Sequence, residues 1–136
     1  MNYTHTVHYY ETDKMGITHH SNYIRWMEEA RTAFLSENGW PYDRLEQDGV
    51  FSPVVSVSCR YVKPTTYADR VEIAVFVKAF SGVRLTFGYT MTLNGETVCL
   101  AESEHCFLDG TGRLYRLKKE IPALFAFLTA EAEKNG

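Results

Sequence analysis

A short segment rich in acid, imidazole and hydroxyl side chains has the clearest potential for chemistry in this sequence. It covers residues 9–23, in which Asp13 is followed by Gly16 and then by His20. A positioned carboxylate can activate water or attack a carbonyl carbon directly. Gly16 has no side chain, so the backbone at that point could approach a ligand closely. These residue types predict a hydrolytic site with Asp13 at its centre.

The residues after this segment predict the helix that positions it. His20 would stand at the entrance of this helix, where backbone amides have no partner inside the helix. Such amides, together with the helix dipole, can polarise a carbonyl group and stabilise the oxyanion that forms on attack. The helix is expected from Asn22 to Leu35, because apolar side chains recur there at helical spacing in one stripe: Tyr23, Trp26, Met27, Ala30, Ala33 and Phe34.

Most of the remaining chain has the period of two that is typical of strands. Ser81-Gly82 and Asn94-Gly95 separate successive runs, and Asn-Gly is a strong hairpin signal, so the joined strands should pair antiparallel. The pattern predicts the α+β class, with one antiparallel sheet that curls around the long helix, and leaves the order of the strands open. We expect strands over residues 3–10, 55–61, 71–77, 83–93 and 98–108, a short helix over 41–48 and a C-terminal helix from about residue 122.

The bulk properties limit the classes of protein to consider. A chain of 136 residues fits one domain, so we expect a single domain over residues 1–136. No stretch is apolar enough to span a membrane and no targeting peptide is visible, which favours a cytoplasmic location. A formal net charge of -3 argues against nucleic-acid binding. Cys59, Cys99 and Cys106 lack a metal-binding spacing and are expected to be buried free thiols.

The histidines raise the question of a metal site. His5, His8, His19 and His20 could be grouped with Asp13, but adjacent histidines rarely reach the same ion, and no metal-binding motif occurs. His5 and His8 are an odd number of positions apart in the predicted first strand and should face opposite sides of it. We therefore expect no metal and no bound cofactor.

Other nucleophiles and other acids have weaker support than Asp13. The sequence has no GxSxG turn that would present a catalytic serine. Glu28 and Glu29 on the long helix are expected to be solvated or interfacial acids. Cationic side chains could contact the phosphates of a phosphorylated ligand or could simply be scattered surface charges, and these are Lys63, Arg84, Arg113 and Lys118.

One set of residues resembles a known family signature. The sequence resembles the branch of the hot-dog superfamily that contains 4-hydroxybenzoyl-CoA thioesterase and YbgC-like proteins. The similarity extends more loosely over nearly the whole chain. The specific residues are Tyr10-Glu11-Thr12-Asp13 with Met15-Gly16, then His20-Ser21-Asn22-Tyr23, Trp26, Glu28 and Ala30-Arg31, and the supporting ones are Tyr61, Lys63-Pro64, Tyr67 and Asp69.

The resemblance implies roles for individual residues. Asp13 matches the catalytic carboxylate of the family, which acts as nucleophile or as general base toward water. His20 matches the helix-entrance position whose backbone amide helps to polarise the thioester carbonyl. Tyr23 and Trp26 would lie near the acyl pocket or in the core between sheet and helix. In this family the subunits form homodimers through their sheet edges, often paired further into homotetramers, with active sites at the interface.

The resemblance thus implies an acyl-CoA thioesterase that releases free CoA and a carboxylic acid, with coenzyme A as part of the substrate. Two alternatives remain open. The same fold could bind an acyl-CoA or an acyl carrier without cleaving it, or the substrate could be an acyl-carrier protein. The spacing of Asp13 and Gly16 favours an enzyme over a binding module.

Overall fold

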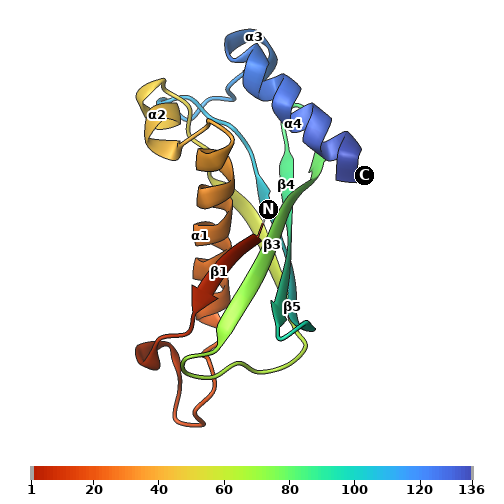
Figure 1. Cartoon of the computed structure of the whole chain (residues 1–136). Helices are drawn as coiled ribbons and strands as arrows, with labels where there is room; N and C mark the ends of the chain where they lie inside the picture. Colours follow the sequence, from red (N-terminus) through yellow and green to blue (C-terminus); the bar gives the residue numbers. More distant parts are fainter. Residues whose placement is uncertain (1, 136) are drawn as a thin grey trace.

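The computed structural model describes residues 2–135 and shows one five-stranded antiparallel sheet with helices packed against it (Figure 1). The strand order is β1-β3-β4-β5-β2, so the second strand of the chain forms the edge opposite the first. The elements in chain order are β1 (Asn2–Thr6), the 3-10 turn η1 (Tyr9–Glu11), α1 (Ser21–Glu37), α2 (Tyr42–Gln47), β2 (Val54–Tyr61), β3 (Arg70–Phe80), β4 (Leu85–Leu93), β5 (Glu96–His105), α3 (Leu117–Glu120) and α4 (Pro122–Asn135).

The predicted hairpins are confirmed. β3 pairs with β4 and β4 pairs with β5, each antiparallel. Asn94 and Gly95 between β4 and β5 have φ angles of 52° and 83°, the positive values that a tight two-residue turn requires. The edge strands could not be assigned from the sequence: β1 pairs with β3, whereas β2 pairs with β5.

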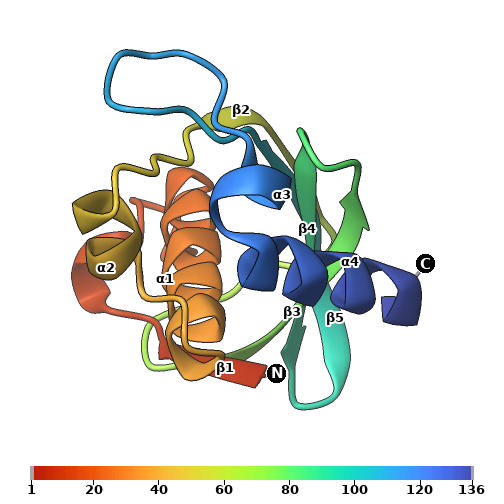
Figure 2. The same ribbon diagram turned by 90° about the horizontal axis from the view of Figure 1, so that it is seen from above.

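The sheet curves around α1, as expected, and the two bury a common core (Figure 2). Seen from above, the strands surround α1 on one side, from β1 to β2. The apolar stripe of α1 and the alternating inward residues of β3 and β4 explain this packing, because each element presents one apolar face. The largest side chains in this core are Trp26, Met27, Ile73, Phe87, Tyr89 and Met91, each exposed by 1% or less.

The first strand is shorter than its sequence pattern predicts. Its pairing with β3 ends at Thr6, opposite Arg70, and the chain then turns into η1. The expected strand over residues 3–10 is therefore wrong in its second half, because the buried Val7 is followed by Tyr9 and Tyr10, which are 76% and 78% exposed and break the alternation.

The two ends of the sheet have different surroundings. At one end, the connection from β2 to β3 lies beside the loop between β1 and α1 (Figure 1). At the other end, α4 packs against β3 and covers it with Leu124 and Leu128. Among the helices within residues 2–135, none has the length and apolar character needed to cross a membrane.

Candidate active site

The loop between β1 and α1 is built as a small ladder that ends in a turn at Asp13. The amide of His19 donates to the carbonyl of Glu11 at 2.8 Å, and the amide of Asp13 donates to the carbonyl of Ile17 at 2.9 Å. Gly16 closes the turn through its amide, which donates to the Asp13 carbonyl at 3.0 Å. Gly16 has a φ of +80°, which an L side chain rarely adopts.

Gly16 is therefore required for its backbone conformation. A Cβ atom built at this position would meet no heavy atom within 4 Å, so no neighbouring part of the chain approaches it closely. The carbonyl of Gly16 accepts a hydrogen bond from Thr66 Oγ1 at 2.6 Å. That bond ties the tip of the loop to the connection between β2 and β3.

The Asp13 carboxylate is exposed at the end of this ladder. Its Oδ1 atom accepts a hydrogen bond from the amide of Met15 at 2.8 Å. Within residues 2–135, Oδ2 accepts no hydrogen bond, so one oxygen remains available for a substrate or a water molecule. Asp13 also borders two hollows in the surface, one on each side of the loop.

The helix entrance supplies a free backbone donor at His20, a residue that lines one hollow together with Asp13. His20 lies at the entrance of α1, as expected, and is its N-cap residue. The neighbouring amides are occupied: Ser21 donates to His19 Nδ1, Asn22 to the His19 carbonyl and Tyr23 to the His20 carbonyl. The amide of His20 itself donates to no acceptor within the part of the chain that the structure describes. The electrostatics of the helix start favour negative charge at this amide.

The first hollow joins Asp13 and His20 with apolar side chains. Its volume is about 390 Å³, and its lining consists of Asp13, Ile17, Thr18, His20, Tyr23, Tyr61, Val62, Lys63 and Pro64. The Tyr61 hydroxyl donates to the His20 carbonyl at 3.2 Å. Burial, followed by the effect of neighbouring Cys59, raises the pKa of Tyr61 to about 12, so its hydroxyl remains a donor at neutral pH.

The second hollow, of about 720 Å³, is more polar. Two cationic side chains border it, Lys14 and Arg25, and neither makes an ion pair with a described residue. Its complete lining is Tyr9, Tyr10, Thr12, Asp13, Lys14, His19, Ser21, Asn22 and Arg25. The Asp13 loop thus separates a largely apolar hollow from a polar and cationic one.

The four predicted substrate-binding residues are distributed unevenly. Tyr23 and Lys63 line the apolar hollow, with the Tyr23 hydroxyl hydrogen-bonded to Thr65 Oγ1 at 2.9 Å. Trp26 is 0% exposed and belongs to the core, so it lines neither hollow. Arg84 pairs with Glu104 and directly precedes β4, at the end of the sheet opposite Tyr61. A single chain therefore does not bring Arg84 to Asp13.

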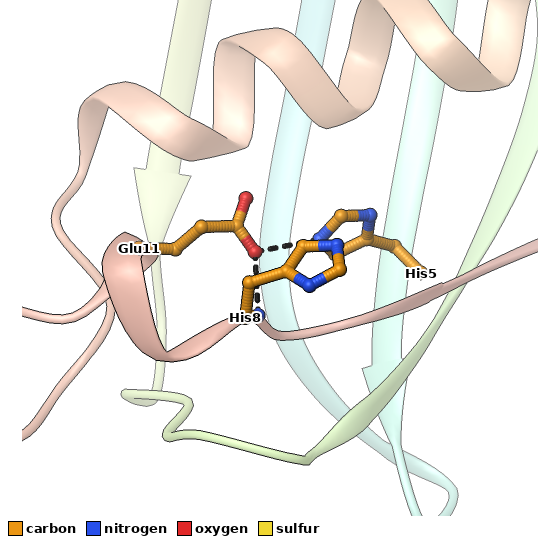
Figure 3. Close-up of side chains that lie close together, drawn as sticks. All are labelled: His5, His8 and Glu11. Atoms are coloured by element: carbon orange, nitrogen blue, oxygen red, sulfur yellow. Dashed lines mark hydrogen bonds and ion pairs between the residues drawn. The ribbon is translucent and has the colours of Figure 1, made fainter.

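The sequence analysis did not predict a cluster of one buried acid and two histidines next to the loop, formed by Glu11, His5 and His8 (Figure 3). Glu11 is 4% exposed and hydrogen-bonded to His5, which is 6% exposed. The prediction that His5 and His8 face opposite sides is wrong, because the strand ends at Thr6 and the two rings lie 5.5 Å apart. No periodic pattern in the sequence predicts this cluster, since Glu11 lies in the short turn η1 and not in a strand or an α-helix.

The donor atoms of His5, His8 and Glu11 lie within 4.8 Å of one another, a spacing that could hold a metal ion. Both carboxylate oxygens of Glu11 already accept hydrogen bonds from nitrogen donors, however. A metal ion that binds Glu11 Oε1 would have to displace the hydrogen bond from His5 Nε2. The contacts therefore describe a hydrogen-bonded carboxylate.

The remaining candidate groups lie away from Asp13 or are inaccessible. Glu29 accepts a hydrogen bond from Tyr3 at 2.8 Å and borders neither hollow. The three cysteines are free, as predicted, but only Cys99 is fully buried. A hydrogen bond with Cys99 lowers the pKa of Cys59 to about 7, yet Cys59 lines neither hollow beside Asp13.

Comparisons with known proteins place this geometry in a family. A model of the Thioesterase-like superfamily matches residues 7–129. YneP of Bacillus subtilis, provisionally named an acyl-CoA thioesterase, is 38% identical over 104 residues, which are 76% of this chain and 75% of YneP. The acyl-CoA thioester hydrolase YbgC of Escherichia coli is 29% identical over 98 residues, 72% of each chain.

A solved structure supports the same relationship. The DHNA-CoA thioesterase of Staphylococcus aureus superposes with a TM-score of 0.91 at 27% identity, over 99% of this chain and 94% of that protein. The resemblance to hot-dog thioesterases is thereby confirmed for the fold as well as for the sequence. The chain belongs to the thioesterase-like superfamily and has its hot-dog fold.

Proposed function

We propose that this protein hydrolyses an acyl-CoA thioester to free CoA and a carboxylic acid, with Asp13 as the catalytic carboxylate. Membership of the family makes the protein a thioester hydrolase. The observation that carries the assignment to Asp13 is that Asp13 and His20 line one hollow, with a carboxylate oxygen of Asp13 and the amide of His20 both unpaired within residues 2–135.

The geometry supports a mechanism in which the thioester carbonyl oxygen accepts a hydrogen bond from the His20 amide. Negative charge that develops on this oxygen is stabilised by the amide and by the start of α1, a helix of 17 residues. Asp13 then acts in one of two ways. It attacks the carbonyl carbon and expels the CoA thiolate, leaving an anhydride that water hydrolyses, or it removes a proton from the attacking water.

The two hollows suggest how the substrate lies. The acyl group occupies the hollow lined by Tyr23, Tyr61 and Val62, where apolar surface is available. The phosphate-bearing part of CoA then extends toward the hollow that carries Lys14 and Arg25, whose positive charges suit phosphates. Asp13 stands between them, at the thioester. This reaction needs no cofactor beyond the coenzyme A of the substrate.

The test is the release of free thiol from acetyl-, hexanoyl-, benzoyl- and palmitoyl-CoA by the native protein and by Asp13→Asn. Asparagine keeps the shape of the side chain and removes its charge and basicity. We expect kcat to fall by at least roughly a hundredfold, the range of a positioned acid-base group. Asp43→Asn is the matched control, because it makes the same change on an exposed carboxylate of α2.

Three results would redirect the proposal. Full activity of Asp13→Asn would move the catalytic role to another residue. A native protein that binds the esters without releasing thiol would be a binding module. Hydrolysis of acyl groups on a carrier protein but not on CoA would leave the mechanism in place and change the carrier.

We also propose that the protein acts as a homodimer, or as a homotetramer of such dimers, joined through the free edge of β2. Within residues 2–135, this strand pairs with β5 alone. Its open edge is accompanied by exposed apolar side chains, an arrangement that invites pairing with a second copy. These side chains are Val54, Val55, Tyr61, Val62 and Leu100, exposed by 43–47%. Tyr61 and Val62 also line the apolar hollow, so the interface would adjoin the site.

Light scattering tests this assembly. We expect a mass of at least about twice the 15.6 kDa of one chain. A monomer with full thioesterase activity would contradict it. For the location of the enzyme we propose the cytoplasm, a reducing compartment that suits three free cysteines.

A further inference from the structure

Glu11 is a buried carboxylate that the proposed mechanism does not use. It lies two residues before Asp13 and is only 4% exposed. A charged group in this position costs free energy unless hydrogen bonds replace its water shell. Within the described residues, the Glu11 carboxylate accepts three hydrogen bonds, and all three come from the elements that hold the Asp13 loop.

The side chain of Glu11 joins three parts of the chain, and Figure 3 shows its bonds to His5 and to His8. Its Oε1 atom accepts hydrogen bonds from His5 Nε2 on β1 and from the amide of His8, each at 2.8 Å. Its Oε2 atom accepts a hydrogen bond from Trp26 Nε1 on α1, also at 2.8 Å. Strand β1, turn η1 and helix α1 are therefore fixed relative to one another through one carboxylate.

The backbone of Glu11 carries this constraint into the catalytic loop. Its carbonyl accepts hydrogen bonds from the amide of His19 at 2.8 Å and from Asn22 Nδ2 at 3.0 Å. The His19 bond is the first rung of the ladder whose next rung joins Asp13 to Ile17 at 2.9 Å. The anchored residue thus sits at the base of both legs of the loop, one leading to Asp13 and the other to His20.

We propose that Glu11 is a positioning residue that fixes the distance between the Asp13 carboxylate and the His20 amide. This inference rests on the proposed function, in which both groups act on one thioester. Catalysis is sensitive to this distance, because a displacement of about 1 Å can reduce a rate by about a hundredfold. Glu11 does not touch the reacting atoms and acts only through the loop.

The electrostatic balance at Glu11 agrees with an ionised anchor. Burial alone would raise the pKa of this carboxyl, but hydrogen bonds from the His8 amide, His5 and Trp26 together lower the pKa below its ordinary value. The group therefore accepts all three hydrogen bonds as a carboxylate at neutral pH. A glutamine at this position could accept one or two of them, and its amide nitrogen would face another N–H donor.

The experiment compares Glu11→Gln with Glu29→Gln in the full-length protein. Glu29 is the matched control: it accepts a hydrogen bond from the Tyr3 hydroxyl at 2.8 Å and lies 3.5 Å from His5 Nδ1, but within the described chain it makes no hydrogen bond or ion pair with residues 12–20. For Glu11→Gln we expect kcat on the best CoA ester to fall about tenfold to a hundredfold while KM changes less than about threefold. For Glu29→Gln we expect both constants within about threefold of native.

A second variant keeps the test decisive if Glu11→Gln does not fold. Trp26→Phe retains an aromatic ring in the core and removes the donor to Oε2, together with part of the volume of the buried indole ring. It should lower kcat by a smaller factor, with thermal unfolding measured beside it to confirm that each variant is folded at the assay temperature. Loss of thermal stability with unchanged kcat in folded Glu11→Gln, or in folded Trp26→Phe if Glu11→Gln does not fold, would overturn the positioning role and leave a purely structural one.

The failure of this inference is distinguishable from the failure of the proposed function. If the native protein releases thiol and Glu11→Gln does so equally well, the positioning role is wrong and the thioesterase assignment stands. If the native protein releases no thiol from any ester, both are wrong, because no reaction remains for Glu11 to support.

Discussion

Similar chemical groups lie beside the start of helix α1 and beside its later turns, in opposite surroundings. At its start, Asp13 and His20 are exposed and border a hollow. Deep in the sheet beside the later turns of the helix, Ser103 and His105 are exposed by 1% and 0%. Ser103 Oγ and His105 Nε2 lie 2.8 Å apart, the distance expected of a serine nucleophile and its base. Only the first end can receive a substrate.

This difference teaches that access, more than residue type, separates the proposed catalytic site from the buried pair. The Ser103 hydroxyl is also hydrogen-bonded to the Tyr89 hydroxyl at 2.7 Å, so it belongs to a closed buried network. Arg31, 8% exposed, adds a positive charge there without a carboxylate partner in the described chain. Burial, and then the charge of Arg31, lower the pKa of His105 to about 4.

The largest effect that we expect from this contrast is a loss of folding stability in acid, caused by the buried His105. In the unfolded chain His105 takes up a proton near pH 6.5, whereas in the folded protein it stays neutral down to about pH 4. The unfolded state therefore binds more protons between these values, and folding stability falls as the pH is lowered through that window. The loss attributable to His105 should approach about 3 kcal/mol.

Urea unfolding at a series of pH values measures this loss. His105→Gln, which does not titrate, should show a flatter decline between pH 6.5 and pH 4 than the native protein. His8→Gln is the control, because it makes the same substitution on an exposed imidazole outside the network of Ser103 and His105. Equal slopes for native protein and His105→Gln would show that the folded protein admits the proton.

The sequence predicts the exposed end of α1 better than the buried end, for a physical reason. Asp13, Gly16 and His20 are close together along the chain, so their spatial relation follows from one loop and one helix start. The contact of His105 with Ser103 is local as well, but its burial depends on the packing of α1 against the sheet, for example of Phe34 against Phe87. No local pattern distinguishes a buried polar pair from an exposed one.

The same distinction explains which parts of the fold were predicted. The helix expected over residues 22–35 and the hairpin turn at Asn94-Gly95 arise from local periodicity and local backbone preference. The placement of β1 and β2 at opposite edges depends on pairing between distant segments, which a single sequence pattern does not encode. The anchor at Glu11 was missed for that reason too, since its partners His5 and Trp26 come from different elements.

A smaller effect separates two surface cations at opposite ends of the sheet. Lys63 borders the apolar hollow and pairs with Glu96, whereas Arg84 pairs with Glu104 at the far end. Both pairs are exposed, so Lys63→Ala and Arg84→Ala should lower stability equally and by less than about 1 kcal/mol.

Steady-state kinetics should distinguish Lys63 from Arg84, although the two substitutions have similar effects on stability. Lys63 borders a hollow beside Asp13, so its positive charge adds to the attraction that Lys14 and Arg25 exert on the phosphates of CoA. Lys63→Ala should therefore raise KM by up to about fivefold, the value of one exposed ion pair, and added salt should reduce this difference. Arg84→Ala should leave KM within about twofold, because one chain keeps Arg84 away from Asp13. A larger KM effect for Arg84→Ala would indicate that a second subunit carries its own Arg84 to the site, which would connect substrate binding to the edge of β2.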